Sequence, residues 1–267
     1  MAKAKNQPGR YDAIIIEIFQ RHYQPGIKSF EFSRSEFTEV ATHLGIALPK
    51  NIGNVLYSFR FRRDLPKQIL DTATTGLEWV IELAGHANYR FHLSQINRIL
   101  PNPNLIQVKI PDSTPEIIAK YALTDEQALL AKVRYNRLID IFLSITTYSL
   151  QNHLRTTVKD IGQIEIDEIY VGVNRNGTHF VIPVQAKGGD DQLGVVQTKQ
   201  DIACCSAKFP ELICRPISVQ FMADNLIAMF ELALEGEQVR VVEEKHYKLV
   251  SATEVSSEEL RSYRVRE

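Results

Sequence analysis

Two strand-like segments joined by a tight turn lie in the middle of the chain and constrain its fold more than any other feature. They span Gln163 to Lys187, and the turn sequence NRNG at 174–177, typical of a β-hairpin, separates them. Successive side chains alternate between the faces of a strand, so Gln185 and Lys187 share a face, about 7 Å apart. Asp167 lies close to them if the register of the two strands places its side chain on the same face of the sheet. The stretch therefore predicts a hairpin that presents an acid, an amide and a lysine at one place.

This combination of side chains suits hydrolysis of a phosphodiester. Oxygen ligands such as a carboxylate and an amide carbonyl favour Mg²⁺, which keeps several of its waters when bound. Phosphodiester hydrolysis needs a hydroxide and a counter-charge for the phosphate, and Lys187 can orient the water or stabilise the developing negative charge. The alternative is structural: Asp167 as an exposed strand residue and Lys187 as a charge that protects a sheet edge.

The hairpin resembles the core of the PD-(D/E)XK nuclease superfamily, to which most Type II restriction endonucleases belong. In that family an Asp on one strand and a (Glu/Asp)-x-Lys on the next bind Mg²⁺ and cut DNA. The resemblance assigns the first acid to Asp167 and the lysine to Lys187. It implies that Asp167, Gln185 and the backbone carbonyl of Ala186 hold the metal.

The sequence departs from the family pattern at the second acid, where it has Gln185. A glutamine carbonyl can coordinate a cation but brings no negative charge, so weaker Mg²⁺ binding is expected. Glu165 and Glu168 are the nearest carboxylates that could compensate. The departure also leaves open a relative without catalytic activity.

The residues after the lysine predict a crossover connection. Residues 192–208 carry apolar positions at near-helical spacing, and residues 212–221 form a strand-like run. Strand, helix and strand in this order form a crossover unit, which is right-handed in nearly all cases. The resemblance implies that a residue of this helix reaches the active centre. Gln197 is the first candidate, with Lys199 and Gln200 as alternatives.

The first hundred residues predict a second module. Apolar positions at helical spacing favour helices over 11–23, 33–44 and 51–61, and residues 77–83 and 88–93 alternate as a hairpin does. Three helices followed by a hairpin are similar in outline to a winged helix-turn-helix. No short motif accompanies this resemblance.

The third of these helices carries polar and basic residues that suit DNA. Asn and Arg read base edges bidentately, and Arg also binds phosphates. The alternative is a solvated helix face on a winged helix that binds protein. The candidate DNA-binding residues are Asn51, Asn54, Ser58, Arg60, Arg62 and Arg63 on the helix and its exit, and Arg90 on the hairpin.

Length and composition set the remaining limits. A chain of 267 residues is enough for two modest domains, and proline-rich segments near 101–104 and 111–115 predict a boundary there. We expect a winged-helix-like domain over 1–110 and a nuclease-like domain over 111–267. The expected class is α+β overall, with an α/β nuclease-like core built on a central mixed sheet. Helices are expected over 124–149 and 224–234.

Charge, cysteines and hydropathy narrow the setting. The net charge of −1 means that any DNA-binding face arises from local clusters. The three cysteines have no metal-binding spacing, which fits a reducing cytoplasm. No apolar run reaches the roughly 20 residues that span a bilayer, so no membrane association is expected.

Together these features predict a Mg²⁺-dependent endonuclease acting on double-stranded DNA, and specifically a Type II restriction enzyme. Cutting both strands predicts a homodimer that matches a palindromic site. Two alternatives remain: a winged-helix DNA-binding regulator with an inactive nuclease-like domain, and a repair nuclease that recognises DNA structure.

Overall fold

The computed structural model forms two compact units, which the contacts divide into residues 1–98 with 157–163 and residues 99–156 with 164–267. Only the backbone is described for Asn54 and Phe61. The described residues are 9–61, 63–85, 87–95, 99–121, 126–159, 161–188, 194–236 and 238–264.

In the described part of the first unit, helices pack on a three-stranded antiparallel sheet of order β1-β3-β2. The predicted helices and the predicted hairpin are confirmed, whereas β1 and the one-turn helix α4 were not expected. The helices are α1 (Arg10–His22), α2 (Arg34–His43), α3 (Ile52–Phe61) and α4 (Lys67–Leu70), and the strands are β1 (Ser29–Ser33), β2 (Leu77–Leu83) and β3 (Asn88–Gln95).

Ser33 starts α2 through a reciprocal capping arrangement. Its hydroxyl accepts a hydrogen bond from the Glu36 amide at 3.3 Å, and the Glu36 carboxylate accepts one from the Ser33 amide at 2.8 Å. Two amides that the helix leaves unpaired are thereby satisfied. Ser33 also ends β1, so a single residue sets both the end of the strand and the start of the helix.

Aromatic rings fill the core of this unit. The Phe19 ring lies 5.0 Å from Tyr23, 5.1 Å from Trp79 and 5.2 Å from Phe91, measured between ring centroids. Phe91 is fully buried on the central strand β3. The sheet is therefore attached to α1 mainly by ring packing.

Phe91→Ala is expected to lower the free energy of unfolding of this unit by about 3–5 kcal/mol, because it removes a buried ring and leaves a cavity. Urea unfolding followed by the fluorescence of Trp79, the single tryptophan, measures it. Leu44→Ala is the control, because Leu44 is 40% exposed. An equal loss in both variants would contradict this account of the core.

The second unit is built on an open mixed sheet of order β4-β11-β10-β9-β7-β6-β5, with β8 beside β7. β6 and β7 are antiparallel, whereas β7 and β9 are parallel. The expected α+β class with a central mixed sheet is thus confirmed. The strands are β4 (Gln107–Pro111), β5 (Thr146–Val158), β6 (Gly162–Val173), β7 (His179–Gly188), β8 (Ile213–Cys214), β9 (Ile217–Phe221), β10 (Leu226–Glu235) and β11 (Gln238–Val250).

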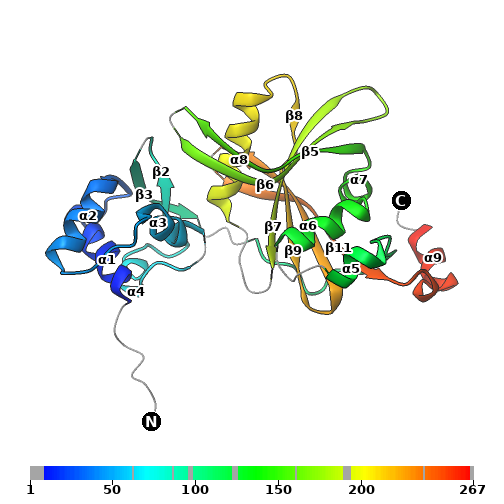
Figure 1. The fold of residues 1–267 in the computed structure, drawn as a ribbon, viewed down its shortest axis with the longest axis horizontal. Coiled ribbons are helices and arrows are strands. Elements are labelled where there is room, and N and C mark those ends of the chain that lie inside the picture. The colour runs from blue at the N-terminus through cyan, green and yellow to red at the C-terminus, as the bar shows by residue number, and fades with distance from the viewer. Residues whose placement is uncertain are drawn as a thin grey trace, which may run out of the picture. The chain divides into compact units, whose positions relative to one another are not determined.

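Helices lie on both faces of this sheet (Figure 1). Residues of α6 and α7 pack against Ile182, Val184 and Ala186 of β7, whereas Cys205 of α8 packs against Val181 on the opposite face. The parallel pairing of β7 and β9 around α8 confirms the predicted crossover. The helices are α5 (Glu116–Tyr121), α6 (Glu126–Tyr135), α7 (Leu138–Leu143), α8 (Val195–Lys208) and α9 (Ser257–Tyr263), with 3₁₀ turns η1 (Ala223–Asn225) and η2 (Ala252–Glu254).

The single helix expected over 124–149 is wrong. Within the described residues α6 ends at Tyr135, and α7 follows from Leu138 to Leu143. The break comes at Arg137, whose φ of 50° lies in the left-handed region. The Asn136 side chain accepts a hydrogen bond from the Ser113 amide at 2.7 Å, which ties the break to the preceding segment. β-branched residues at 146 and 147 then begin a strand.

The helix expected over 224–234 is also wrong, because this segment is the strand β10. Residues on both faces of β10 are buried between neighbouring layers, so its sequence is an apolar run interrupted by Glu231 rather than an alternation. Such a run does not distinguish a buried strand from a buried helix.

The division between the units falls at residue 98, before the boundary expected near residue 110. Strand β4 explains the difference, because it pairs in parallel with β11. Across the described part of the chain, no helix is both long and apolar enough to cross a membrane.

Candidate active site

The register of β6 and β7 places Asp167 and Gln185 on the same face of the sheet. Glu168 pairs with Val184, so the neighbouring residues Asp167 and Gln185 face the opposite way, toward α8. The Asp167 carboxylate accepts a hydrogen bond from the Ala186 amide at 2.9 Å. The strand pairing therefore brings together the acid and the amide that the sequence proposed as metal ligands.

A second acid lies beside Gln185. The amide nitrogen of Gln185 donates to both carboxylate oxygens of Asp201, at 2.9 and 3.1 Å. The carbonyl of Gln185 accepts a hydrogen bond from Gln197 at 2.6 Å. Gln197 and Asp201 both lie on α8, one helical turn apart, so this helix supports Gln185 from two sides.

Lys187 points to the same region and is paired with an acid from α6. Its ammonium lies 3.1 Å from a carboxylate oxygen of Glu126. The Lys187 side chain is only 10% exposed, so few waters solvate its charge. Glu126 is the first residue of α6 and brings that helix to the lysine.

Burial and neighbouring negative charges raise the pKa values of the two carboxyl groups in this region. Burial raises the pKa of Asp167, the Ala186 amide and Lys187 oppose that rise, and Glu126 adds to it. Burial also raises the pKa of Asp201 well above its usual value, and the nearby Asp167 adds to the rise. A divalent cation would relieve this cost, so the residues fit a bound Mg²⁺.

The oxygen donors for such a cation are few and mixed. Among the described residues, no group of three or more His, Cys, Asp and Glu side chains is arranged to hold a metal ion. A site here would combine the Asp167 carboxylate with carbonyl oxygens, and waters would fill the remaining positions, as Mg²⁺ accepts.

The side-chain carboxylates of the two other acids considered from the sequence have partners outside this arrangement, although the Glu165 backbone carbonyl accepts from Gln185 at 3.3 Å. Glu165 shares the face of Asp167 but pairs with His153 at 2.9 Å and Arg155 at 3.3 Å. Glu168 is fully buried on the opposite face, where Arg134 donates to it at 2.9 Å. Asp201 is the carboxylate in contact with Gln185.

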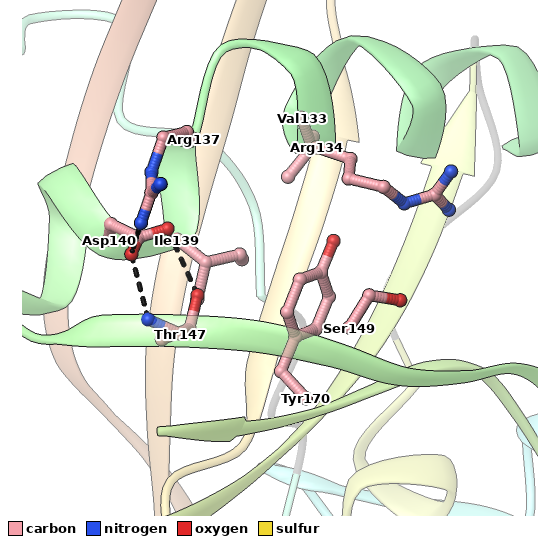
Figure 2. Close-up of a pocket in the computed structure, with 8 residues that line it drawn as sticks. All are labelled: Val133, Arg134, Arg137, Ile139, Asp140, Thr147, Ser149 and Tyr170. Atoms are coloured by element: carbon pink, nitrogen blue, oxygen red, sulfur yellow. Dashed lines mark hydrogen bonds and ion pairs between the residues drawn. The ribbon is translucent and has the colours of Figure 1, made fainter. Parts of the chain in front are cut away.

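A small cavity of about 120 Å³ lies on the Glu168 face and is separate from the candidate site (Figure 2). The Asp140 carboxylate beside it accepts hydrogen bonds from Arg137 at 2.7 Å and from the Thr147 amide at 2.7 Å. These contacts tie α7 to β5, which is a structural role. The lining residues are Val133, Arg134, Arg137, Ile139, Asp140, Thr147, Ser149 and Tyr170.

The candidate DNA-binding arginines of the first unit have partners within that unit. Arg63 forms an ion pair with Asp12 and stacks 4.1 Å from the centre of the Phe59 ring. Arg90 pairs with Glu31 on the neighbouring strand at 2.6 Å.

The other candidates on α3 differ in exposure. Burial lowers the pKa of Arg60 to about 10, and Tyr89 is one of the groups that oppose this shift. Ser58 is half-buried, and Asn51 is exposed just before the helix. Arg62 and the side chain of Asn54 lie outside the described residues.

Sequence reasoning missed Glu126 and Asp201. Asp201 is separated from Gln185 by 16 residues and Glu126 from Lys187 by 61. The available signal for Asp201 was an acid among polar residues on the helix face that also carries the apolar Val196, Cys204 and Cys205, since α8 buries all of these residues.

Comparison with known proteins returned no match: no family model, no curated protein and no solved structure matches this chain.

Proposed function

We propose that this protein is a Mg²⁺-dependent endonuclease that hydrolyses phosphodiester bonds in double-stranded DNA, specifically a Type II restriction enzyme. The observation that supports it is the convergence of Asp167, Gln185 and Lys187 on one face of a β-hairpin that continues into a crossover. This arrangement agrees with what the resemblance to PD-(D/E)XK nucleases implies for these positions. Lys187 also pairs with Glu126, and a lysine that only protected a sheet edge would not need such a partner.

Each residue has a role in this proposal. Asp167, the carbonyl of Gln185 and the backbone carbonyl of Ala186 would hold Mg²⁺, which when bound would neutralise phosphate charge and make its water more acidic. Lys187 donates a hydrogen bond to the attacking water or to a phosphate oxygen as negative charge develops there. Glu126 holds the Lys187 ammonium in position. The water would lose a proton to solvent and its oxygen would bond to phosphorus, while the bond to the leaving oxygen would break and that oxygen would take up a proton from solvent.

The first unit is proposed to bind the duplex as a winged helix-turn-helix. Its order of helix, strand, two helices, a one-turn helix and a hairpin supports this, with α3 as the recognition helix. The exposed Asn51 and the basic residues at the exit of α3 offer contacts to bases and phosphates. Because Arg63 and Arg90 are already paired, binding DNA requires them to share or exchange their acidic partners.

Arg63→Ala is expected to weaken binding to duplex DNA for all sequences and to reduce the slope of log affinity against log salt by about one. Fluorescence anisotropy with labelled duplexes at several salt concentrations measures both quantities. Arg21→Ala is the control, because Arg21 pairs with Glu17 on the surface of α1. Equal affinities and slopes for the parent and Arg63→Ala would exclude a phosphate contact by Arg63.

A homodimer in the cytoplasm completes the proposal. Cutting both strands of a palindromic site needs two active sites related by a two-fold axis. All three cysteines are free, which fits a reducing compartment. Light scattering of the protein eluting from a sizing column, with and without duplex DNA, tests the dimer.

Incubation of the purified protein with unmethylated plasmid or phage DNA tests the function. Discrete fragments with Mg²⁺ and none with EDTA are expected, and mapping their ends reveals the recognition site. Intact DNA together with a shift of duplex mobility would instead indicate a DNA-binding regulator. Cleavage confined to branched or mismatched DNA would indicate a repair nuclease.

A further inference from the structure

The Gln185 amide nitrogen donates to a buried carboxyl group, Asp201, and at 3.3 Å to the backbone carbonyl of Glu165, and these acceptors orient the amide. Asp201 has 1% of its surface exposed, and both of its oxygens accept from the same amide nitrogen. A carboxylate only accepts hydrogen bonds, so it requires the nitrogen of Gln185 on its side. The carbonyl of Gln185 must then point away from Asp201, where Gln197 donates to it at 2.6 Å.

Asp201 also places a carboxyl group in a buried position, where a bound cation would stabilise its ionised form. A buried carboxylate is costly unless it is paired or coordinates a metal. Its described hydrogen bonds come only from the neutral Gln185 amide, and Lys187 acts on it through its charge without a hydrogen bond among the described contacts.

We propose that Asp201 is a positioning residue of the metal site, which holds the Gln185 carbonyl toward the metal and supplies the negative charge that Gln185 lacks. This inference rests on the proposed function and names a residue for the same site. Gln185 and Asp201 together then replace a single acidic ligand: the glutamine supplies the oxygen, and the helix supplies the charge.

Two substitutions separate this role from a packing role. Asp201→Asn keeps the size of the side chain but removes the carboxylate, and its amide can also donate to the Gln185 carbonyl. The Glu165 backbone carbonyl, at 3.3 Å, is then the remaining group that only accepts from the Gln185 nitrogen, so the native orientation of Gln185 is favoured less strongly. Gln185→Glu places a carboxylate at position 185, next to the location of the native Asp201 carboxyl group. The effect of Asp201→Asn on Mg²⁺ affinity should therefore depend on the residue at position 185.

Titration calorimetry of the full-length protein with Mg²⁺ in the absence of DNA measures this dependence. With glutamine at position 185, Asp201→Asn is expected to weaken Mg²⁺ binding by about 10- to 100-fold, as loss of a group that orients a metal ligand does. When Gln185→Glu is also present, the same substitution is expected to change the affinity less than about threefold, because a carboxylate remains in the pair.

Controls separate this result from unfolding. Thermal unfolding of each variant without Mg²⁺ verifies that it folds. Glu168→Gln is the matched control, because it alters a buried carboxylate on the opposite face of the same strand pair and should leave Mg²⁺ affinity unchanged. The side-chain amide resonance of Gln185, assigned by its loss in Gln185→Glu, should move in Asp201→Asn and not in Glu168→Gln.

The outcomes for the two proposals differ. An unchanged Mg²⁺ affinity in Asp201→Asn, or an equal loss with either residue at position 185, would overturn the role of Asp201 while the nuclease proposal stands. A parent protein that binds no Mg²⁺ would overturn both.

Discussion

Lys187→Ala is expected to reduce the rate of DNA cleavage by about 100- to 1000-fold, as loss of one donor to developing charge does. Lys187 is nearly buried and lies beside the proposed metal ligands, so solvent water replaces its ammonium poorly. Affinity for duplex DNA is expected to change little, because the proposed binding face is on the first unit.

Single-turnover cleavage with Mg²⁺, together with an anisotropy titration in EDTA, separates the chemical step from binding. Lys208→Ala is the matched control, because Lys208 is an exposed lysine at the end of α8. If Lys187→Ala cuts DNA as fast as the parent, the assignment of this site is wrong. Asp167→Asn is expected to fail in the same assay, since it removes the charge of the proposed metal ligand.

Glu168→Ala is expected to lower the free energy of unfolding of the second unit by about 2–3 kcal/mol. Its carboxylate is fully buried and accepts from Arg134 at 2.9 Å and from Ser149 at 2.5 Å. Breaking a buried ion pair costs about 3–5 kcal/mol, and the value here is smaller because solvent reaches Arg134. The Arg134 side chain is 36% exposed.

Urea unfolding followed by circular dichroism measures this loss. Glu165→Ala is the control, because Glu165 is 30% exposed and its pairs with His153 and Arg155 lie at the surface. Its loss should stay below about 1 kcal/mol. A Glu168→Ala protein as stable as the parent would show that the buried pair contributes nothing to the fold.

The neighbours Asp167 and Glu168 have different expected effects, because their side chains lie on opposite faces of the sheet. Substitution of Asp167 is expected to affect cleavage, and substitution of Glu168 is expected to affect stability.

The errors in predicted secondary structure have a common physical cause. In β10 both faces are buried, so its apolar run lacks the alternation that identifies a strand. In the segment 124–149 the helical pattern continues in sequence through a break that a left-handed Arg137 makes. A local sequence pattern indicates which residues are buried. It does not indicate whether one face or both faces of an element are covered by other layers.

The sequence alone determined the β6–β7 hairpin, its turn, the crossover through α8 and the common face of Gln185 and Lys187, because these follow from local spacing. The tertiary structure decided which acids reach that face. Asp201 and Glu126 come from helices on opposite sides of the sheet, and only the packing of α8 and α6 brings them to Gln185 and Lys187. No periodicity along the chain records contacts of this kind, since they join residues whose separation in sequence has no relation to their distance in space.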